Sequence, residues 1–304
     1  MRVAQNGKGE MIVKRFFTCM LVAIMVLTML SATAFAVEPG EERVTLGADL
    51  TDEQIEQIYQ DFDIERGSVT EIQVTNDEER TYLAGLVPDK KIGHVALSSI
   101  YLMTLQEGSG IHVEIHNINW CTEDMYSNAL ITAGVKDASI VVSAPFPVSG
   151  TAALTGVYKA YEDITGTKLD ETAKEAAAEE LVVTGELAES IGSDDATLMI
   201  NELKKILDQT RNMTDEELRA EIQKIADANN ISLTEEEMQQ LISLCRTLEN
   251  VDIDAWADKL VQLSKTGKDV SNFFQSVGDF FVSVGDFFTN LFTDIGNFFS
   301  NLFG

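Results

Sequence analysis

Apolar residues recur at two spacings along the chain, and the balance between them changes near residue 150. Before that point, short apolar or alternating runs typical of strands lie between segments with the three-to-four-residue spacing of helices. After it, nearly every segment has the helical spacing. We therefore expect an α+β fold, with a mixed α/β sheet region over 37–150, a mostly helical region over 151–268 and an amphipathic tail helix over 269–304.

Capping and turn residues set the boundaries of the elements predicted in the first half. Thr51-Asp52-Glu53-Gln54 is a capping box, and Gly108-Ser109-Gly110 indicates a hairpin between the strands on either side of it. The strand that follows these glycines, the next helix and the next strand would form a right-handed βαβ unit. The predicted strands span 69–75, 94–105, 111–118 and 139–144, and the predicted helices span 51–62, 76–86 and 122–133.

The second half contains two strong capping boxes, Thr214–Glu217 and Thr234–Glu237. The loop between their helices, residues 227–232, lacks the central glycine and the fifth-position oxygen ligand of an EF-hand, so we interpret the pair as a helical hairpin. The helices predicted in this half lie at about 150–164, 169–190, 194–211, 215–229, 235–249 and 253–266.

Phenylalanine dominates the end of the chain, where ten of its fifteen copies lie between residues 271 and 304. A helix would gather them into one stripe, with Asp279, Asp286 and Asp294 on the opposite face. These regularly spaced charges exclude a membrane-spanning helix. The residues we expect to contact a membrane or a partner are Phe273, Phe274, Phe280, Phe281, Phe287, Phe288, Phe298 and Phe299.

Three surfaces compete for this stripe: a membrane interface, a partner or second copy of the chain, and the protein's own domain. The polar face carries no Lys or Arg, which interfacial helices usually have. Gly278, Gly285 and Gly296 weaken an isolated helix, so the tail needs a surface in order to form well. We favour contact with a membrane or a partner, self-association included, over docking onto its own domain.

The first 36 residues have the three parts of a secretory signal peptide. Four basic residues precede an uncharged apolar run over 16–30, and small residues follow it. Ala34 and Ala36 place the cleavage after Ala36, and cleavage after Ala34 is the alternative. An uncleaved membrane anchor is a further alternative, because the apolar run is nearly long enough to span a bilayer. We expect a secreted or extracytoplasmic protein, associated with the cell envelope.

The net charge of −28 argues against nucleic acid as a partner, because phosphate binding needs clustered Lys and Arg. Two cysteines, Cys121 and Cys245, remain after the leader, and outside the cell they could pair. The apolar helical spacing around Cys245 favours a buried, unpaired side chain instead. No P-loop, Rossmann, G-x-S-x-G or H-E-x-x-H pattern is present, so we expect no cofactor.

His112, Glu114 and His116 alternate along one predicted strand and would share one face. Two imidazoles and a carboxylate can bind a divalent metal, but polar residues on a solvated sheet face are the more common reason for such a pattern. We therefore expect no metal and keep these three residues as the only candidates.

The predicted βαβ unit places two further groups of residues at the carboxyl ends of its strands, where open α/β sheets bind ligands. The second strand leads into a helix whose free amide groups would bind an anion, unless Ser149 or Thr151 caps them. The candidate ligand-binding residues are His116, Asn117, Asn119, Trp120, Ser149 and Thr151.

Three segments make the chain similar to a known family: residues 44–51 (VTLGADLT), 116–120 (HNINW) and 145–156 (PFPVSGTAALTG). Over roughly 40–250 the chain resembles the bacterial domain-of-unknown-function family 1002. The resemblance implies an exported protein of about this length, and it implies no activity. We expect a non-enzymatic extracytoplasmic binding protein. The alternative is a secreted hydrolase or other small-molecule enzyme with a cleft near His116, Trp120 and Ser149.

Overall fold

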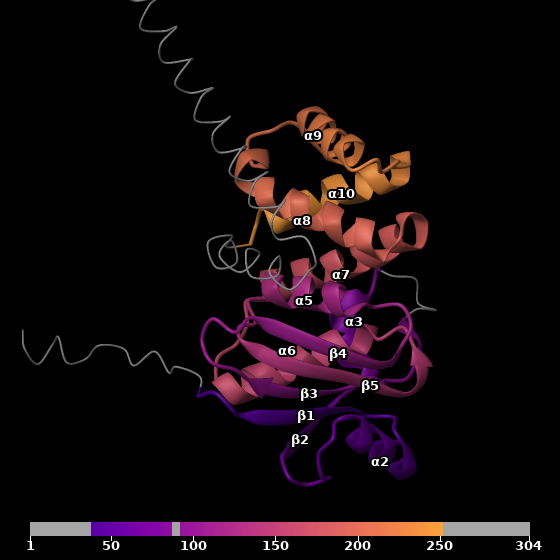
Figure 1. The fold of residues 1–304 in the computed structure, drawn as a ribbon, viewed down its shortest axis with the longest axis vertical. Coiled ribbons are helices and arrows are strands. Elements are labelled where there is room, and N and C mark those ends of the chain that lie inside the picture. The colour runs from indigo at the N-terminus through magenta and orange to yellow at the C-terminus, as the bar shows by residue number, and fades with distance from the viewer. Residues whose placement is uncertain (1–37, 87–91, 252–304) are drawn as a thin grey trace, which may run out of the picture. The chain divides into compact units, whose positions relative to one another are not determined.

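The computed structural model describes residues 38–86 and 92–251, which contain a five-stranded mixed sheet and its covering helices (Figure 1). β1 pairs with β2 and β4 with β5 in parallel, whereas β3 is antiparallel to β1 and β5. The α+β class is therefore confirmed. The strands are β1 (Glu42–Gly47), β2 (Thr70–Val74), β3 (Ser99–Thr104), β4 (Ile111–Ile118) and β5 (Ala138–Val148), in the order β2-β1-β3-β5-β4.

The hairpin predicted at Gly108-Ser109-Gly110 is wrong, because β5 lies between β3 and β4. β5 buries residues on both of its faces, such as Val142 and Ser143, and so suits a position between two strands. β4 exposes His112 and Glu114 and suits the edge of the sheet. The strand–helix–strand unit is confirmed, since α5 (Glu123–Thr132) connects β4 to its parallel neighbour β5.

Opposite faces of the sheet pack against different helices. On one face, Val44 and Leu46 of β1 pack against α2 (Asp52–Asp61), which begins at the predicted Thr51 capping box. The other face carries α5 and α6 (Thr151–Thr165). Gly156 of α6 allows the close approach there, and a Cβ built on it would lie 3.5 Å from Ile100 of β3. α3 (Asn76–Leu83) packs beside α6.

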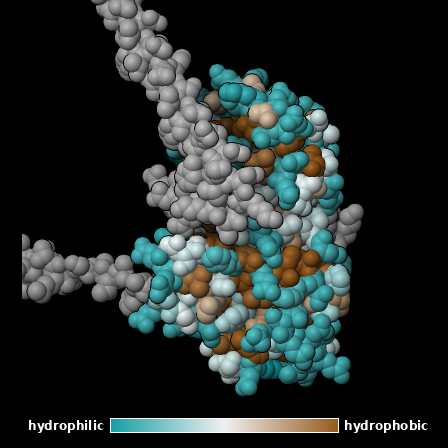
Figure 2. Space-filling view, in the orientation of Figure 1, coloured by the Kyte–Doolittle hydropathy of each residue, from teal (hydrophilic) through white to brown (hydrophobic). Residues whose placement is uncertain are grey.

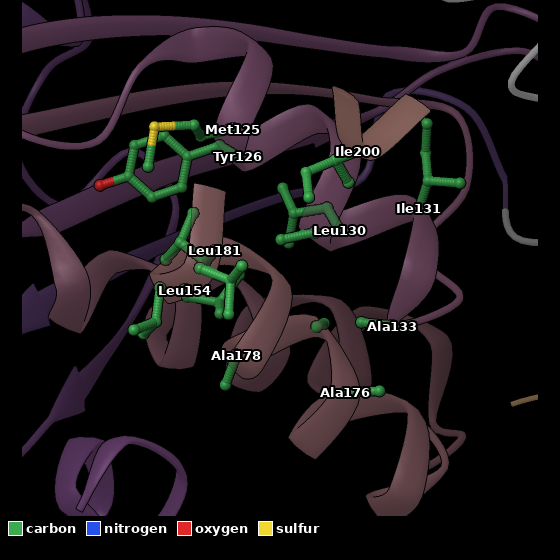
Figure 3. Close-up of a cluster of buried hydrophobic side chains, with 14 of the residues drawn as sticks. Met125, Tyr126, Leu130, Ile131, Ala133, Leu154, Ala176, Ala178, Leu181 and Ile200 are labelled. Atoms are coloured by element: carbon green, nitrogen blue, oxygen red, sulfur yellow. The ribbon is translucent and has the colours of Figure 1, made fainter. Parts of the chain in front are cut away.

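The remaining helices share one hydrophobic core with α5, α6 and the sheet. α7 (Glu171–Ile191) lies along α5, and its buried alanines permit close packing (Figure 3). α8 (Ser193–Thr210) and α10 (Glu235–Leu248) pack on α7, and α9 (Asp215–Ala228) packs on α8 and α10. Both capping boxes predicted in this half are present, at Thr214 and Thr234. The predicted helix at 253–266, the predicted leader and the predicted tail helix lie outside the described residues.

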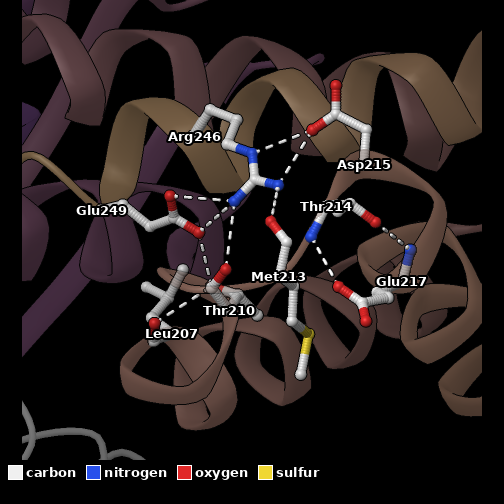
Figure 4. Close-up of polar contacts among 8 residues, drawn as sticks. All are labelled: Leu207, Thr210, Met213, Thr214, Asp215, Glu217, Arg246 and Glu249. Carbon is white, nitrogen blue, oxygen red and sulfur yellow. Dashed lines mark hydrogen bonds and ion pairs between the residues drawn. The ribbon is translucent and has the colours of Figure 1, made fainter.

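Arg246 of α10 ties the turn between α8 and α9 to its own helix (Figure 4). Its guanidinium donates to the carbonyl oxygens of Thr210 at 3.1 Å and Met213 at 2.7 Å. It also donates to the carboxylates of Asp215 and Glu249, both at 2.9 Å. These charge-assisted bonds link α10 to the last residue of α8 and to the turn that follows it.

Hydrophilic residues cover much of the face seen in Figure 2. Hydrophobic residues show through in the lower part, around the sheet, and in the upper part, among the C-terminal helices. Among residues 38–86 and 92–251, the large hydrophobic side chains that are clearly exposed are Val95 at 50% and Phe146 at 48%. No helix within these ranges is long and apolar enough to cross a bilayer.

Candidate functional site

The carboxyl ends of β4 and β5 bring the segments 116–120 and 145–151 together. Because the two strands are parallel, their ends meet at the same edge of the sheet. The Asn119 amide donates to the Val148 carbonyl at 2.9 Å, and the Cys121 amide donates to the Ser149 carbonyl at 3.1 Å. The candidate ligand-binding residues therefore lie on two adjoining segments at the edge where open α/β sheets bind ligands.

Asn117 interrupts the regular pairing of β4 with β5. Its backbone has a φ of 56°, a left-handed conformation that asparagine tolerates better than most residues. The register shifts between His116 and Ile118 at this point, and the Asn117 side-chain amide donates to the Ala144 carbonyl at 2.8 Å. The side chain thus closes a bulge in the sheet, which is a structural use of this amide.

Trp120 fastens the end of β4 to α7. A Cβ built on Gly185 of α7 would lie 2.4 Å from Cζ2 of the Trp120 ring, so only glycine leaves room for the indole. The indole N–H donates to Glu189 of the same helix at 2.8 Å. Both ends of the side chain are therefore held by α7.

The turn from β5 into α6 centres on Gly150, which has a φ of 93° and would clash with Tyr126 if it carried a Cβ. The Tyr126 hydroxyl donates to the Gly150 carbonyl at 2.6 Å. The cap residue of α6 is Gly150, which has no side chain to bond to the first turn. The hydroxyls of Ser149 and Thr151 lie 3.3 Å from each other.

Glu79 is a member of this site that the sequence did not reveal. It lies on α3, is 1% exposed, and its Oε1 accepts a 2.7 Å hydrogen bond from the Thr151 hydroxyl at the start of α6. Asn76 donates to its other oxygen at 3.2 Å. Burial raises the pKa of Glu79 to about 7, against the lowering influence of these bonds and of Arg80. Leu83 lies one helical turn after Glu79, and both are buried on the same face of α3. This spacing from an apolar residue was the one sign in the sequence that Glu79 faces inward.

His112, Glu114 and His116 share one face of β4, but the structure does not join them into a metal site. The His116 Nε2 lies 3.1 Å from a Glu114 oxygen, whereas His112 Nε2 lies 3.1 Å from the Ser109 carbonyl. Among the residues that the structure describes, no group of three or more His, Cys, Asp and Glu side chains is arranged to hold a metal ion. By the alternation of β4, His116 lies on the face opposite Val113 and Ile115, which pack against the core that contains α5.

Comparison with known proteins settles the family. A family model described as "protein of unknown function (DUF1002)" matches residues 46–266. The chain belongs to the DUF1002 family. It is also 38% identical over 268 residues to "Uncharacterized protein YpuA" of Bacillus subtilis (strain 168), an alignment that covers 86% of this chain and 91% of that protein. No solved structure matches the chain. The resemblance inferred from residues 44–51, 116–120 and 145–156 is thereby confirmed.

Cys121 and Cys245 of this DUF1002 chain are both buried, and no disulfide joins them. Cys245 lies on the buried face of α10 with Met238, Leu241 and Leu248, as the helical spacing predicted. Burial raises the pKa of its thiol to about 12. The thiol therefore stays protonated near neutral pH, and it packs as a small apolar side chain.

A second buried charge lies away from the sheet edge, between α5, α7 and α8. The Lys204 ammonium of α8 contacts both oxygens of Glu180 on α7, at 2.7 and 3.0 Å, and the Thr132 hydroxyl of α5 at 2.8 Å. Lys204 and Glu180 are 2% and 0% exposed. Burial lowers the pKa of Lys204 despite the nearby carboxylate. The pair is a structural link between three helices rather than part of the sheet-edge site.

Proposed function

We propose that this DUF1002 protein is exported and acts outside the cytoplasm as a non-enzymatic binding protein that its Phe-rich tail holds at the membrane surface. The observation that carries the proposal is the stripe of paired phenylalanines between residues 273 and 303. The leader pattern over residues 1–36 supports the location. The family and the relative from Bacillus subtilis are both of unknown function and name no activity.

The uses of the candidate residues favour a binding role over a hydrolase. The Asn117 amide closes a bulge, and the Trp120 indole is seated on α7. The Thr151 hydroxyl, 1% exposed, donates to Glu79 inside the protein. These three side chains are thus engaged in holding the fold together and are not presented to a substrate. Nucleic acid is not a suitable partner for a chain with a net charge of −28.

A lipid surface suits the tail better than a partner protein does. The described body has few exposed large hydrophobic side chains, so the phenylalanines form the main apolar surface that the sequence offers. An interfacial helix buries such a stripe at the boundary between headgroups and acyl chains. The aspartates on the polar face predict a preference for zwitterionic over anionic lipid.

The test is co-sedimentation of the full mature chain with phosphatidylcholine vesicles. We expect the wild-type protein to pellet with the vesicles. Replacing Phe280, Phe281, Phe287 and Phe288 with serine should abolish this binding, because it removes most of the buried apolar area at the centre of the stripe. Added phosphatidylglycerol should weaken the binding at low ionic strength, and salt should restore it.

A matched variant controls for the number of changes. Serine at Gln275, Asn290, Asn297 and Asn301 alters the same segment but leaves every phenylalanine in place, and it should bind as the wild type does. Wild-type protein that stays in the supernatant would refute the membrane role. A tail-dependent oligomer in analytical ultracentrifugation, without vesicle binding, would assign the stripe to self-association instead.

A further inference from the structure

We propose that Glu79 is a proton-operated latch between α3 and α6: α3 is docked firmly when the carboxyl group is protonated and loosens when it ionises. The latch consists of Glu79 and Asn76 on α3 and Thr151 at the first residue of α6. The inference does not depend on the proposed membrane role, because it concerns only residues within the described body.

The geometry provides the carboxyl group with neutral partners. Thr151 donates to one oxygen at 2.7 Å and the Asn76 amide to the other at 3.2 Å, and the side chain is almost fully buried. The neighbouring Arg80 directs its guanidinium elsewhere, with Nη2 donating to the Gly93 carbonyl at 2.6 Å and Nε to Asn76 Oδ1 at 3.0 Å. A buried carboxylate with neutral donors is costly unless it binds a proton.

The protonated form also fits the hydrogen-bond network. A neutral Glu79 can donate its proton to the Thr151 hydroxyl oxygen, which leaves the Thr151 hydroxyl hydrogen for Ser149, 3.3 Å away. The bond between Glu79 and Thr151 is therefore retained with its direction reversed. The first turn of α6 favours the ionised form through its dipole, but burial acts in the other direction and outweighs it.

The two neighbours of Glu79 whose pKa values are shifted, Tyr126 and Glu78, are shifted away from the range of pH in which Glu79 titrates. Tyr126 of α5 faces Glu79 and is fully buried, which raises its pKa well above the usual 10 and keeps it neutral. Glu78, on the adjoining position of α3, bonds to Lys159 of α6, and its pKa is lowered chiefly by this bond and by those from Thr75, in spite of burial. Cys121 lies beside Tyr126 and contributes to the raised pKa of that hydroxyl. Of Tyr126, Glu78 and Glu79, the last is the one whose pKa lies between pH 5 and pH 8.

The sign follows from the raised pKa. The docked state binds the proton more tightly than an undocked state, whose Glu79 would titrate near the ordinary 4.5, so docking weakens as the pH rises from about 4.5 to about 7. Those two pKa values predict a roughly 25-fold rise in the undocked fraction of α3 between pH 5.5 and pH 8. Undocking would separate Glu79 from Thr151 and open the first turn of α6 to water.

Hydrogen exchange at the α3 amides tests the latch in the full mature chain. After correction for intrinsic rates, the protection of residues 79–84 should fall roughly 25-fold from pH 5.5 to pH 8 in the wild type, as the linkage predicts. Glu79→Gln, which cannot ionise, should remove this dependence. Glu78→Gln is the matched control: it loses the charge that faces Lys159 and lowers protection at every pH, yet it keeps the fall with pH.

A second measurement needs no variant. The side-chain carboxyl carbon of Glu79, followed by NMR in the wild-type protein, should titrate near pH 7. A midpoint near 4.5 would overturn the latch. So would α3 amides whose protection is independent of pH, or a Glu79→Gln variant that retains the wild-type dependence.

Discussion

At the scale of single residues, the contact between Gly185 and Trp120 gives a stability prediction. Alanine at Gly185 would place its Cβ 2.4 Å from the Trp120 ring and 2.9 Å from Met125 Cε, so the indole must move. We expect the overpacking to exceed the gain in helix propensity and to lower the free energy of unfolding by about 1–2 kcal/mol. Denaturant unfolding monitored by circular dichroism measures the change.

Gly156→Ala is the control for this prediction, because it is also a helical glycine and its Cβ would meet neighbours at an ordinary 3.5 Å. It should leave stability unchanged or raise it by up to about 1 kcal/mol, through helix propensity. If both alanines changed stability equally, the seat for Trp120 on α7 would not be the cause.

The sequence predicted where the candidate site residues lie but not what each side chain does there. Trp120, Asn117 and Thr151 were correctly brought to one edge of the sheet, because a βαβ unit fixes where parallel strands end. Their individual roles depend on what packs over them, and the glycine beneath Trp120 lies 65 positions away in sequence. Glu79 was missed because acidic residues are ordinary in the first turn of a helix, where Asp77 and Glu78 accompany it.

At the scale of elements, boundaries marked by local chemistry were predictable and strand neighbours were not. The helices that start at Thr51, Thr214 and Thr234 begin where their capping boxes indicate, because a cap needs only residues within one turn. Predicting the order of the strands requires a comparison of how deeply each whole strand is buried. Two glycines between β3 and β4 look the same whether the strands pair or β5 is inserted between them.

At the scale of elements, the buried ion pair between α7 and α8 gives a second stability prediction. Lys204→Met would leave the fully buried Glu180 without its cation, and we expect a loss of about 3–5 kcal/mol in the free energy of unfolding. Lys204→Met combined with Glu180→Leu should recover most of that loss, because it removes both charges. Chemical denaturation of the two variants measures the difference.

Lys205→Met is the control for the ion pair. Lys205 is exposed, it pairs with Glu202 on the same helix, and such a surface pair contributes at most about 1 kcal/mol. A Lys204→Met variant as stable as Lys205→Met would mean that Glu180 takes up a proton or reaches water without disturbing the helices.

At the scale of the whole molecule, the proposed export rests on the leader pattern over residues 1–36, which would determine the surroundings that the acidic body and the tail meet. We expect the protein released into the medium to begin at Val37, because Ala34 and Ala36 provide the two small residues that a signal peptidase requires. Leucine at both positions should block that cleavage and leave the precursor in the membrane fraction, held by the apolar run over 16–30. Intact-mass analysis of the medium and of the membranes distinguishes the two products.

Phe35→Leu isolates the effect of residue size in this experiment. Phe35 lies between the two alanines, where a large residue is already present, so its replacement should leave processing and release unchanged. A wild-type chain that remains at full length in the soluble cytosol would show that the leader pattern does not direct export. The phenylalanine tail would then meet only the inner face of the membrane or cytosolic partners, and the extracytoplasmic role would have to be abandoned.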